Sequence, residues 1–180
     1  MKIVLVTPLY PPDTAEPAPY IKELAGHLST QHDVTIVTYG HLPEEVSGVR
    51  IIAVSKRQPR LLRLIRYTHA LFKAVRTVDI IYTQNGASVE LPVGIVSRLT
   101  GVPVIARIGD AFAHERAERV AILGSIERFM LDRACEVVTH DPVKRPEILP
   151  FASRPDAALR AYAASWEEHL EVLEDTFAHV

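Results

Sequence analysis

The sequence has 180 residues, of which 48% are hydrophobic and 23% charged, with a net charge of −2. This composition supports a packed core and excludes a chain that stays disordered. The near-neutral charge excludes binding of nucleic acid through bulk positive charge, so no nucleic-acid partner is expected. A single cysteine excludes an internal disulfide and a multi-cysteine metal centre, and it favours a reducing compartment.

The apolar pattern alternates between short β-branched runs and longer stretches with helical spacing. Strands are predicted over 3–6, 34–37, 49–54, 80–82, 104–108 and 137–139. Helices are predicted over 20–29, 61–76, 89–99, 126–134 and 156–177. Strands that are apolar on both faces favour an α/β fold, a Rossmann-like parallel sheet of about six strands with helices on both faces.

Two parts of the chain are expected. Residues 1–150 are predicted to form the Rossmann-like domain, and 151–180 a helical segment that packs back on it through Trp166, Leu170 and Leu173. The apolar run 3–6 is shorter than the core of a signal peptide, and no run reaches the roughly 18 apolar residues of a membrane span. We therefore expect a cytoplasmic protein.

The fold class itself predicts where a ligand binds. In an open parallel sheet the site lies beyond the carboxyl ends of the strands, where the strand order reverses, here between the first and fourth strands. The candidate segments at this edge are the proline-rich loop 8–19, the turn 84–88, the segment 109–115 and His140.

Several motifs are absent. The sequence has no G-x-G-x-x-G after the first strand, no G-x-x-x-x-G-K-[ST], no G-x-S-x-G and no H-E-x-x-H. Their absence disfavours a dinucleotide enzyme, a nucleoside triphosphatase and a serine hydrolase, and gives a zinc site little support. We therefore expect no resident cofactor and no metal.

Each polar residue of the candidate segments has two interpretations. Asp110 accepts hydrogen bonds from substrate hydroxyls, or it caps a helix. His114 acts as an acid or base, or it is exposed and idle. The same choice applies to three other positions. Glu115 orders the loop or meets substrate, or it is a first-turn glutamate. Gln84 and Asn85 bind the hydroxyl groups of a ligand, or Asn85 begins a turn. His140 faces the cleft, or it begins the Pro142 turn.

Three stretches carry a resemblance to a known family. The first comprises 2–13, 17–25 and 33–38; the second comprises 79–84, 98–105, Gly109-Asp110 and 115–117; the third is Ser165-Trp166-Glu167 with the apolar spacing after it. Together they resemble a GT-B glycosyltransferase of the retaining family 4 type (glycosyl transferase group 1). The third resembles the last helix of such enzymes, which returns from the second domain to the first.

The resemblance implies half of a retaining sugar transferase. The matching half binds mainly the acceptor, a sugar or a lipid-linked acceptor, while the other half holds the nucleotide-sugar donor. Only 23 residues separate Asp141 from Ser165, so we expect no donor domain here, no activity of the chain alone, and a donor-binding partner in trans. The alternative is a non-catalytic membrane-docking or scaffolding subunit of a split glycosyltransferase.

The resemblance also suggests site residues. Asp110 and His114 are the candidate catalytic residues. The candidate substrate-binding residues are Ala15, Glu16, Gln84, Asn85, Gly109, Glu115 and His140. The sequence departs from the family at two places: Ala15-Glu16 stands where relatives commonly have Gly-Gly, and Gly109-Asp110 where many have His-Asp. A carboxylate at the first position repels a phosphate.

The predicted helix 61–76 is strongly basic. Residues 56–76 contain seven lysines and arginines and no acidic residue. One interpretation is contact with the anionic inner face of a membrane, through Arg60, Leu62, Arg63, Arg66 and Lys73. The other is an ordinary solvated face, opposite an apolar stripe that covers the sheet. This stripe is predicted to comprise Leu61, Leu64, Ile65, Thr68, Leu71, Phe72 and Val75.

Overall fold

The computed structural model describes residues 1–15, 17–139, 141–143 and 155–180. They divide into two compact units, Met1–Val138 and Thr139–Val180. The strands of the first unit are β1 (Lys2–Thr7), β2 (Asp33–Tyr39), β3 (Val49–Val54), β4 (Ile80–Gln84), β5 (Val104–Arg107) and β6 (Ala134–Val138). Its helices are α1 (Ala18–Leu28), α2 (Arg60–Val75), α3 (Ala87–Thr100), α4 (Ala111–Arg119) and α5 (Ala121–Leu131).

The six strands form one parallel sheet with the order β3-β2-β1-β4-β5-β6. This confirms the predicted six-stranded Rossmann-like sheet. The order reverses between β1 and β4, so Val6 pairs with Val37 on one side and with Thr83 on the other. The carboxyl ends of β1 and β4 therefore frame the expected ligand edge.

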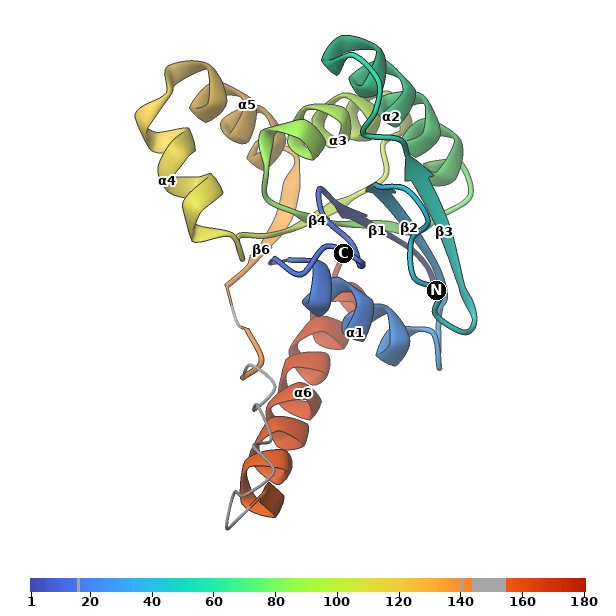
Figure 1. Ribbon diagram of the computed structural model, residues 1–180, viewed down its shortest axis with the longest axis vertical. Coiled ribbons are helices and arrows are strands. Elements are labelled where there is room, and N and C mark those ends of the chain that lie inside the picture. Colours follow the sequence, from blue (N-terminus) through green and yellow to red (C-terminus); the bar gives the residue numbers. More distant parts are fainter. Residues whose placement is uncertain (16, 140, 144–154) are drawn as a thin grey trace. The chain divides into compact units, whose positions relative to one another are not determined.

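Strand β1 lies at the centre of the core. Its residues Ile3 to Val6 are all fully buried. Val4 and Val6 belong to a cluster with Leu71 of α2 and Val93 of α3. Because alternate side chains of a strand point to opposite faces, Ile3 and Leu5 face the other side, which α1 covers (Figure 1). Helices therefore cover both faces of the sheet, as predicted.

Helix α2 packs on the sheet through a face that overlaps the predicted stripe at Leu71 and Val75 but is rotated toward Tyr67. The residues that it buries are Tyr67, Leu71 and Val75. Leu61 and Ile65 of the predicted stripe are 70% and 57% exposed. The cause is Tyr67, whose hydroxyl donates to the carbonyl of Val37 at 2.8 Å and whose ring stacks on Tyr39 at 4.2 Å. These contacts fix the rotation of α2 and leave one apolar flank outside.

Helix α3 contains a proline whose missing hydrogen bond is replaced. Pro92 has no N–H to donate to the carbonyl of Ser88, four residues earlier. The hydroxyl of Tyr39 donates to that carbonyl instead, at 2.9 Å. The helix begins at Ala87, two residues before the predicted start, and ends at Gly101 in the left-handed conformation.

The segment 111–131 differs from the prediction of a single helix over 126–134. Two helices, α4 and α5, meet at Val120, which is extended and flanks both. Gly124 permits this tight turn, because a Cβ there would lie 2.8 Å from the carbonyl oxygen of Ala117. Ala117 is also the buried residue of α4, so α4 has no apolar stripe that periodicity could detect.

The second unit contains helix α6 (Pro155–Ala178). Before the helix, the backbone N–H of Val143 donates to the hydroxyl of Ser165 at 3.1 Å. That hydroxyl in turn donates to the carbonyl of Tyr162 at 2.8 Å. The rings of Trp166 and His169 lie edge to face at 5.8 Å. Among the described helices, none combines the length and apolarity that crossing a bilayer requires.

Candidate functional site

The carboxyl ends of the central strands bring several predicted residues together. Gln84 at the end of β4 pairs in register with Arg107 at the end of β5. Asn85, Gly109 and Asp110 follow these two strands directly. The side chains of Gln84 and Asn85 are buried. Their hydrogen bonds within the protein therefore determine which of their polar atoms can still bind a ligand.

Arg107 is the centre of a buried polar group. One guanidinium nitrogen donates to Oε1 of Gln84 at 2.6 Å, and the guanidinium carbon lies 3.6 Å from the centre of the Tyr20 ring. The hydroxyls of Tyr20 and Tyr82 are 2.8 Å apart. A Cβ at residue 109 would lie 2.1 Å from the guanidinium. A side chain at residue 109 would therefore displace the guanidinium from this position.

The Gln84 amide nitrogen is a buried donor without a hydrogen-bond partner in the described part of the chain. Its orientation is fixed, because the oxygen must face the guanidinium of Arg107. An unsatisfied buried donor costs about 1–3 kcal/mol. Such a group beside the reversal of strand order is a candidate to donate to a ligand oxygen.

Asn85 holds the next loop in place. Its side-chain nitrogen donates to the carbonyl of Asp110 at 2.7 Å, and its side-chain oxygen accepts from the N–H of Asp110 at 2.9 Å. Its own N–H donates to the carbonyl of Arg107 at 3.0 Å. The Asn85 amide thus positions Asp110 through the backbone.

Asp110 caps helix α4. Its Oδ1 accepts from the backbone N–H of Ala113 at 3.1 Å, which is the helix-cap geometry that the sequence allowed. Its Oδ2 has no hydrogen bond within the described residues. One carboxylate oxygen therefore anchors the helix, and the other is available to accept from a hydroxyl.

His114 lies one turn into α4 and pairs with a buried carboxylate. Its Nδ1 is 2.8 Å from Oε1 of Glu127 on α5. The hydrogen bond with Glu127 raises the pKa of His114, the charges of nearby glutamates add to this, and partial burial opposes it. Nε2 lies 3.9 Å from the exposed Glu118, which is too far for a hydrogen bond. Nε2 is therefore the ring nitrogen that can still bind a ligand. A histidine oriented by a carboxylate is a common acid–base arrangement.

Glu90 in the first turn of α3 is a second buried carboxylate, 2% exposed. Burial raises its pKa from 4.5 to about 7, and the Glu127 charge adds to this. A hydrogen bond with the Gly86 backbone and the charge of His114 act in the opposite direction. Glu90, His114 and Glu127 therefore form one electrostatic cluster that joins α3, α4 and α5.

The remaining predicted residues do not join this group. Glu115 is exposed and pairs with Arg119 at 3.3 Å, one turn further along α4. It is the fifth residue of the helix, so it is not in the first turn. Ala15 is exposed, and its carbonyl accepts from the N–H of Ala18. Glu16 and His140 lie outside the described residues.

A cavity of about 210 Å³ opens beside the proline-rich loop. Residues that line it include Tyr10, Asp13, Tyr39, His41, Lys56 and Arg57. Lys56 and Asp13 are bridged at 2.6 Å. The hydroxyl of Tyr10 is buried and has no partner in the described part of the chain. Burial raises the Tyr10 pKa to about 12, with a contribution from Glu44, so this hydroxyl stays a neutral donor.

Sequence reasoning missed three residues of the site: Arg107, Glu90 and Glu127. A signal was present for two of them. Arg107 ends a run of apolar strand residues, and Glu90 stands between Val89 and Leu91 in an apolar helix. A charged residue inside an apolar run is buried only when it is paired or neutralised. Glu127 gave no comparable signal, because the nearby residues Ser125 and Arg128 are polar and it does not interrupt an apolar run.

No protein-family model matches the chain, and no curated protein matches it in sequence. Among solved structures it is similar to Anabaena Alr3699/HepE in complex with UDP, with UDP and glucose, and with UDP-glucose. The TM-scores are 0.52, 0.52 and 0.51, at identities of 14%, 13% and 16%. Each match covers 92% of this chain, and 41%, 41% and 40% of the other chain.

The chain thus spans about two-fifths of the length of those structures. At this identity the likeness shows the fold, which is α/β, Rossmann-like and similar to that of a nucleotide-sugar-binding protein.

Proposed function

We propose that this chain is the acceptor-binding half of a retaining GT-B glycosyltransferase of the family 4 type. The observation that carries the proposal is the match itself. It covers nearly all of this chain but about two-fifths of a protein solved with UDP-glucose. The nucleotide-sugar donor would bind mainly to a second domain or subunit, supplied in trans.

The site residues suit an acceptor with hydroxyl groups. Oδ2 of Asp110 would accept from one acceptor hydroxyl, and the amide nitrogen of Gln84 would donate to an oxygen of the same molecule. His114, oriented by Glu127, would exchange a proton through Nε2. The cavity beside Tyr10 would hold a further part of a sugar or lipid-linked acceptor. The nucleotide sugar is a co-substrate, and no resident cofactor is proposed.

Transfer assays with the purified chain test whether these 180 residues need a separate donor-binding half. UDP-glucose and a panel of sugar acceptors are incubated with the chain, and released UDP and glycosylated product are measured. We expect no product. Robust transfer by the chain alone would overturn the proposal that the donor half is supplied elsewhere.

Acceptor binding is tested separately, by saturation-transfer NMR with the same sugar panel. Asp110→Asn removes the carboxylate charge but keeps a good helix cap, so it should weaken the signal without unfolding α4. Glu115→Gln, an exposed change on the same helix, is the matched control. Equal signals from wild type, Asp110→Asn and the control would contradict a role for Asp110.

The second candidate is a non-catalytic scaffolding or membrane-docking subunit of a split enzyme. The exposed Ala15, at a position where relatives commonly have glycine, favours it. This candidate predicts no saturation transfer with any sugar, whereas the acceptor-binding half predicts a signal that depends on Asp110. Under either candidate we propose a cytoplasmic location, peripheral to the inner face of the membrane.

The terminal segment carries a structural proposal. We propose that the helix containing Trp166 packs back on the first domain, as the returning helix of the family does. Replacing Trp166 by alanine should then lower the free energy of unfolding by about 3–5 kcal/mol. A change near zero in chemical denaturation would contradict the packing.

A further inference from the structure

Helices α2 and α3 leave large apolar side chains in solvent. Leu61, Leu62 and Ile65 of α2 are 70%, 42% and 57% exposed, and Leu99 of α3 is 70% exposed. The two helices lie side by side on one face of the sheet (Figure 1). Because Tyr67 fixes the rotation of α2, the apolar flank at Leu61 and Ile65 is not used to cover the sheet.

A groove of about 460 Å³ runs between the two helices. Its lining is Leu64, Ile65, Thr68, His69, Phe72, Ile95, Val96 and Leu99. All but two of these side chains are aliphatic or aromatic. Contiguous apolar surface of this kind on a folded domain marks an interaction site. We call the groove and the exposed leucines around it the α2–α3 surface.

The flank of α2 next to this surface is basic. Arg60, Arg66, Lys73 and Arg76 are exposed, and no ion pair joins any of them to a carboxylate among the described residues. Arg63 is different: it donates to the carbonyl of Lys56 at 3.3 Å and lies over the Tyr39 ring. It therefore points away from the exposed flank, unlike the other four.

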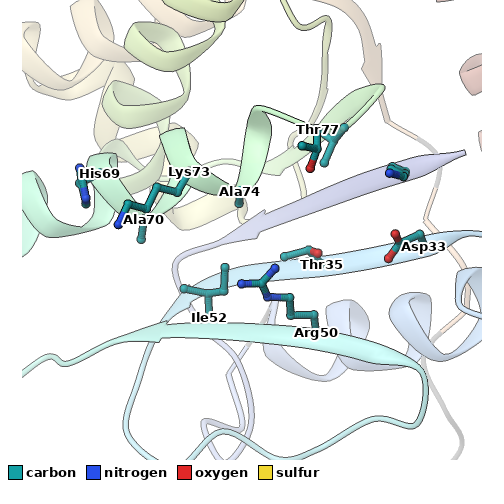
Figure 2. Close-up of a pocket in the computed structure, with 11 residues that line it drawn as sticks. Asp33, Thr35, Arg50, Ile52, His69, Ala70, Lys73, Ala74 and Thr77 are labelled. Atoms are coloured by element: carbon teal, nitrogen blue, oxygen red, sulfur yellow. The ribbon is translucent and has the colours of Figure 1, made fainter.

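The positive charge continues around the helix to a second cavity, of about 430 Å³. Figure 2 shows His69 and Lys73 of α2 on one side of this cavity and Arg50 of β3 on the other. Asp33 is the acidic residue among its lining. Lys73 thus belongs to a basic rim that extends from α2 to the edge of the sheet.

We propose that the α2–α3 surface docks on an anionic lipid bilayer. Leu61, Leu62, Ile65 and Leu99 would enter the interfacial layer. The lipid headgroups would contact exposed basic residues, which are Arg60, Arg66 and Lys73 of α2 and Arg76 just after it. This docking rests on the peripheral location proposed above and assigns the surface that would achieve it; it does not depend on sugar transfer.

Charge complementarity selects the bilayer over other occupants. Apolar side chains beside lysines and arginines, with no acidic residue over 56–76, match the pattern of an interfacial helix on anionic lipid. A second copy of the chain would bring two positive rims together, and like charges across an interface oppose association. Long basic side chains can also lie along apolar surface while their charges reach the headgroups.

Vesicle flotation tests the docking with the full chain. Phosphatidylcholine vesicles are compared with vesicles that also contain phosphatidylglycerol. We expect binding to the anionic vesicles, loss of binding at high salt, and little binding to the neutral ones. Absence of binding to anionic vesicles, or equal binding to both kinds, would overturn the proposal.

Two variants separate the rim from the apolar flank. At about 1 kcal/mol for each basic residue near the lipid, Arg66→Gln with Lys73→Gln should weaken partition about 30-fold. Leu61→Ser with Ile65→Ser should also weaken it, at unchanged net charge. Circular dichroism confirms folding, which is expected because all four side chains are exposed.

The matched control is Arg116→Gln with Arg128→Gln, which removes the same charge from exposed positions on α4 and α5. Partition of this control should stay near wild type. Equal weakening by the control would overturn the assigned surface, because bulk charge would then explain the binding. Sedimentation without lipid provides a second check. If the wild-type chain is a dimer and Leu61→Ser with Ile65→Ser makes it a monomer, a second copy occupies the groove and the proposal is overturned.

Discussion

The carboxyl edge of the sheet and the α2–α3 surface use polar residues in opposite ways. At the edge, Arg107 and Asn85 direct their hydrogen bonds to neighbouring protein groups. On the outer flank of α2, Arg66 and Lys73 are exposed and have no such partners among the described residues. At the edge, internal hydrogen bonds therefore hold in place the few polar atoms that can still bind a ligand. On the flank, all the exposed basic side chains can bind a partner. Internal bonding, more than residue type, distinguishes a positioned site from a docking surface.

The largest expected effect tests the edge through Arg107. Arg107→Met should lower the free energy of unfolding by about 3 kcal/mol, since it removes a charged hydrogen bond to Gln84 and the contact with Tyr20. Chemical denaturation measures the loss. Arg116→Met, at an exposed position of α4, is the control, and a loss no greater than the control's would mean that Arg107 does not organise the edge.

A pH-dependent effect of similar size is expected at Glu90. Burial raises its pKa from 4.5 to about 7, so the folded state retains a proton that the unfolded state releases. Stability therefore falls as the pH rises from 4.5 to about 7 and stays lower above that. Glu90→Gln should be more stable than wild type above neutral pH by at most about 3 kcal/mol, and equal to it in acid.

The measurement is chemical denaturation as a function of pH. Glu115→Gln, an exposed change on α4 whose charge does not act on His114 or Glu90, should leave the wild-type profile unchanged. The raised pKa of His114 acts in the same direction, because stability gained by a protonated histidine is lost as the pH rises through its folded pKa. Glu90→Gln should therefore retain a smaller slope. Parallel profiles for wild type and Glu90→Gln would contradict burial as the cause.

A smaller loss is expected at Asn85. Asn85→Ala removes two hydrogen bonds to the backbone of Asp110 and should cost about 2 kcal/mol. Asn85→Asp keeps the acceptor and loses the donor, so it should fall between wild type and alanine. Hydrogen exchange at the Asp110 amide gives a local readout. Unchanged exchange in Asn85→Ala would show that the loop is held by other contacts.

The smallest expected effect belongs to the other region. Ile65→Gln should change the free energy of unfolding by less than about 0.5 kcal/mol, because the side chain is mostly exposed. Tyr67→Phe, two residues along the same helix, should cost about 1 kcal/mol through the lost bond to Val37. If Ile65→Gln cost more than Tyr67→Phe, the apolar flank would be part of the core.

The sheet was predictable from sequence, and the buried face of α2 was predictable only in part. Apolar β-branched runs such as 3–6 indicate buried parallel strands, because both faces of such a strand need covering. Periodicity placed Leu71 and Val75 of α2 correctly in the core. It missed Tyr67 and included the exposed Ile65, because the rotation of the helix depends on one hydroxyl that reaches the Val37 carbonyl. Helix α4 was missed because its exposed surface carries no apolar repeat.

The candidate site was predictable as a place but only partly as chemistry. The rule for parallel sheets located Gln84, Asn85 and Asp110 at one edge. Sequence alone could not tell that the Asn85 amide binds backbone while the Gln84 nitrogen has no partner, since both depend on atoms brought from other strands. Sequence patterns describe neighbours along the chain, and hydrogen-bond partners at this edge are mostly distant in it.

Tyr39 connects the two regions. Its ring stacks on Tyr67 of α2, its hydroxyl holds the Ser88 carbonyl at the start of α3, and its backbone ends strand β2. These contacts couple the orientation of α2 and of the start of α3 to the sheet. If the chain binds lipid through α2, the Tyr39 contacts would determine the distance and orientation of the Gln84–Asp110 edge relative to the bilayer. Acceptors attached to lipid headgroups would then reach that edge from one direction.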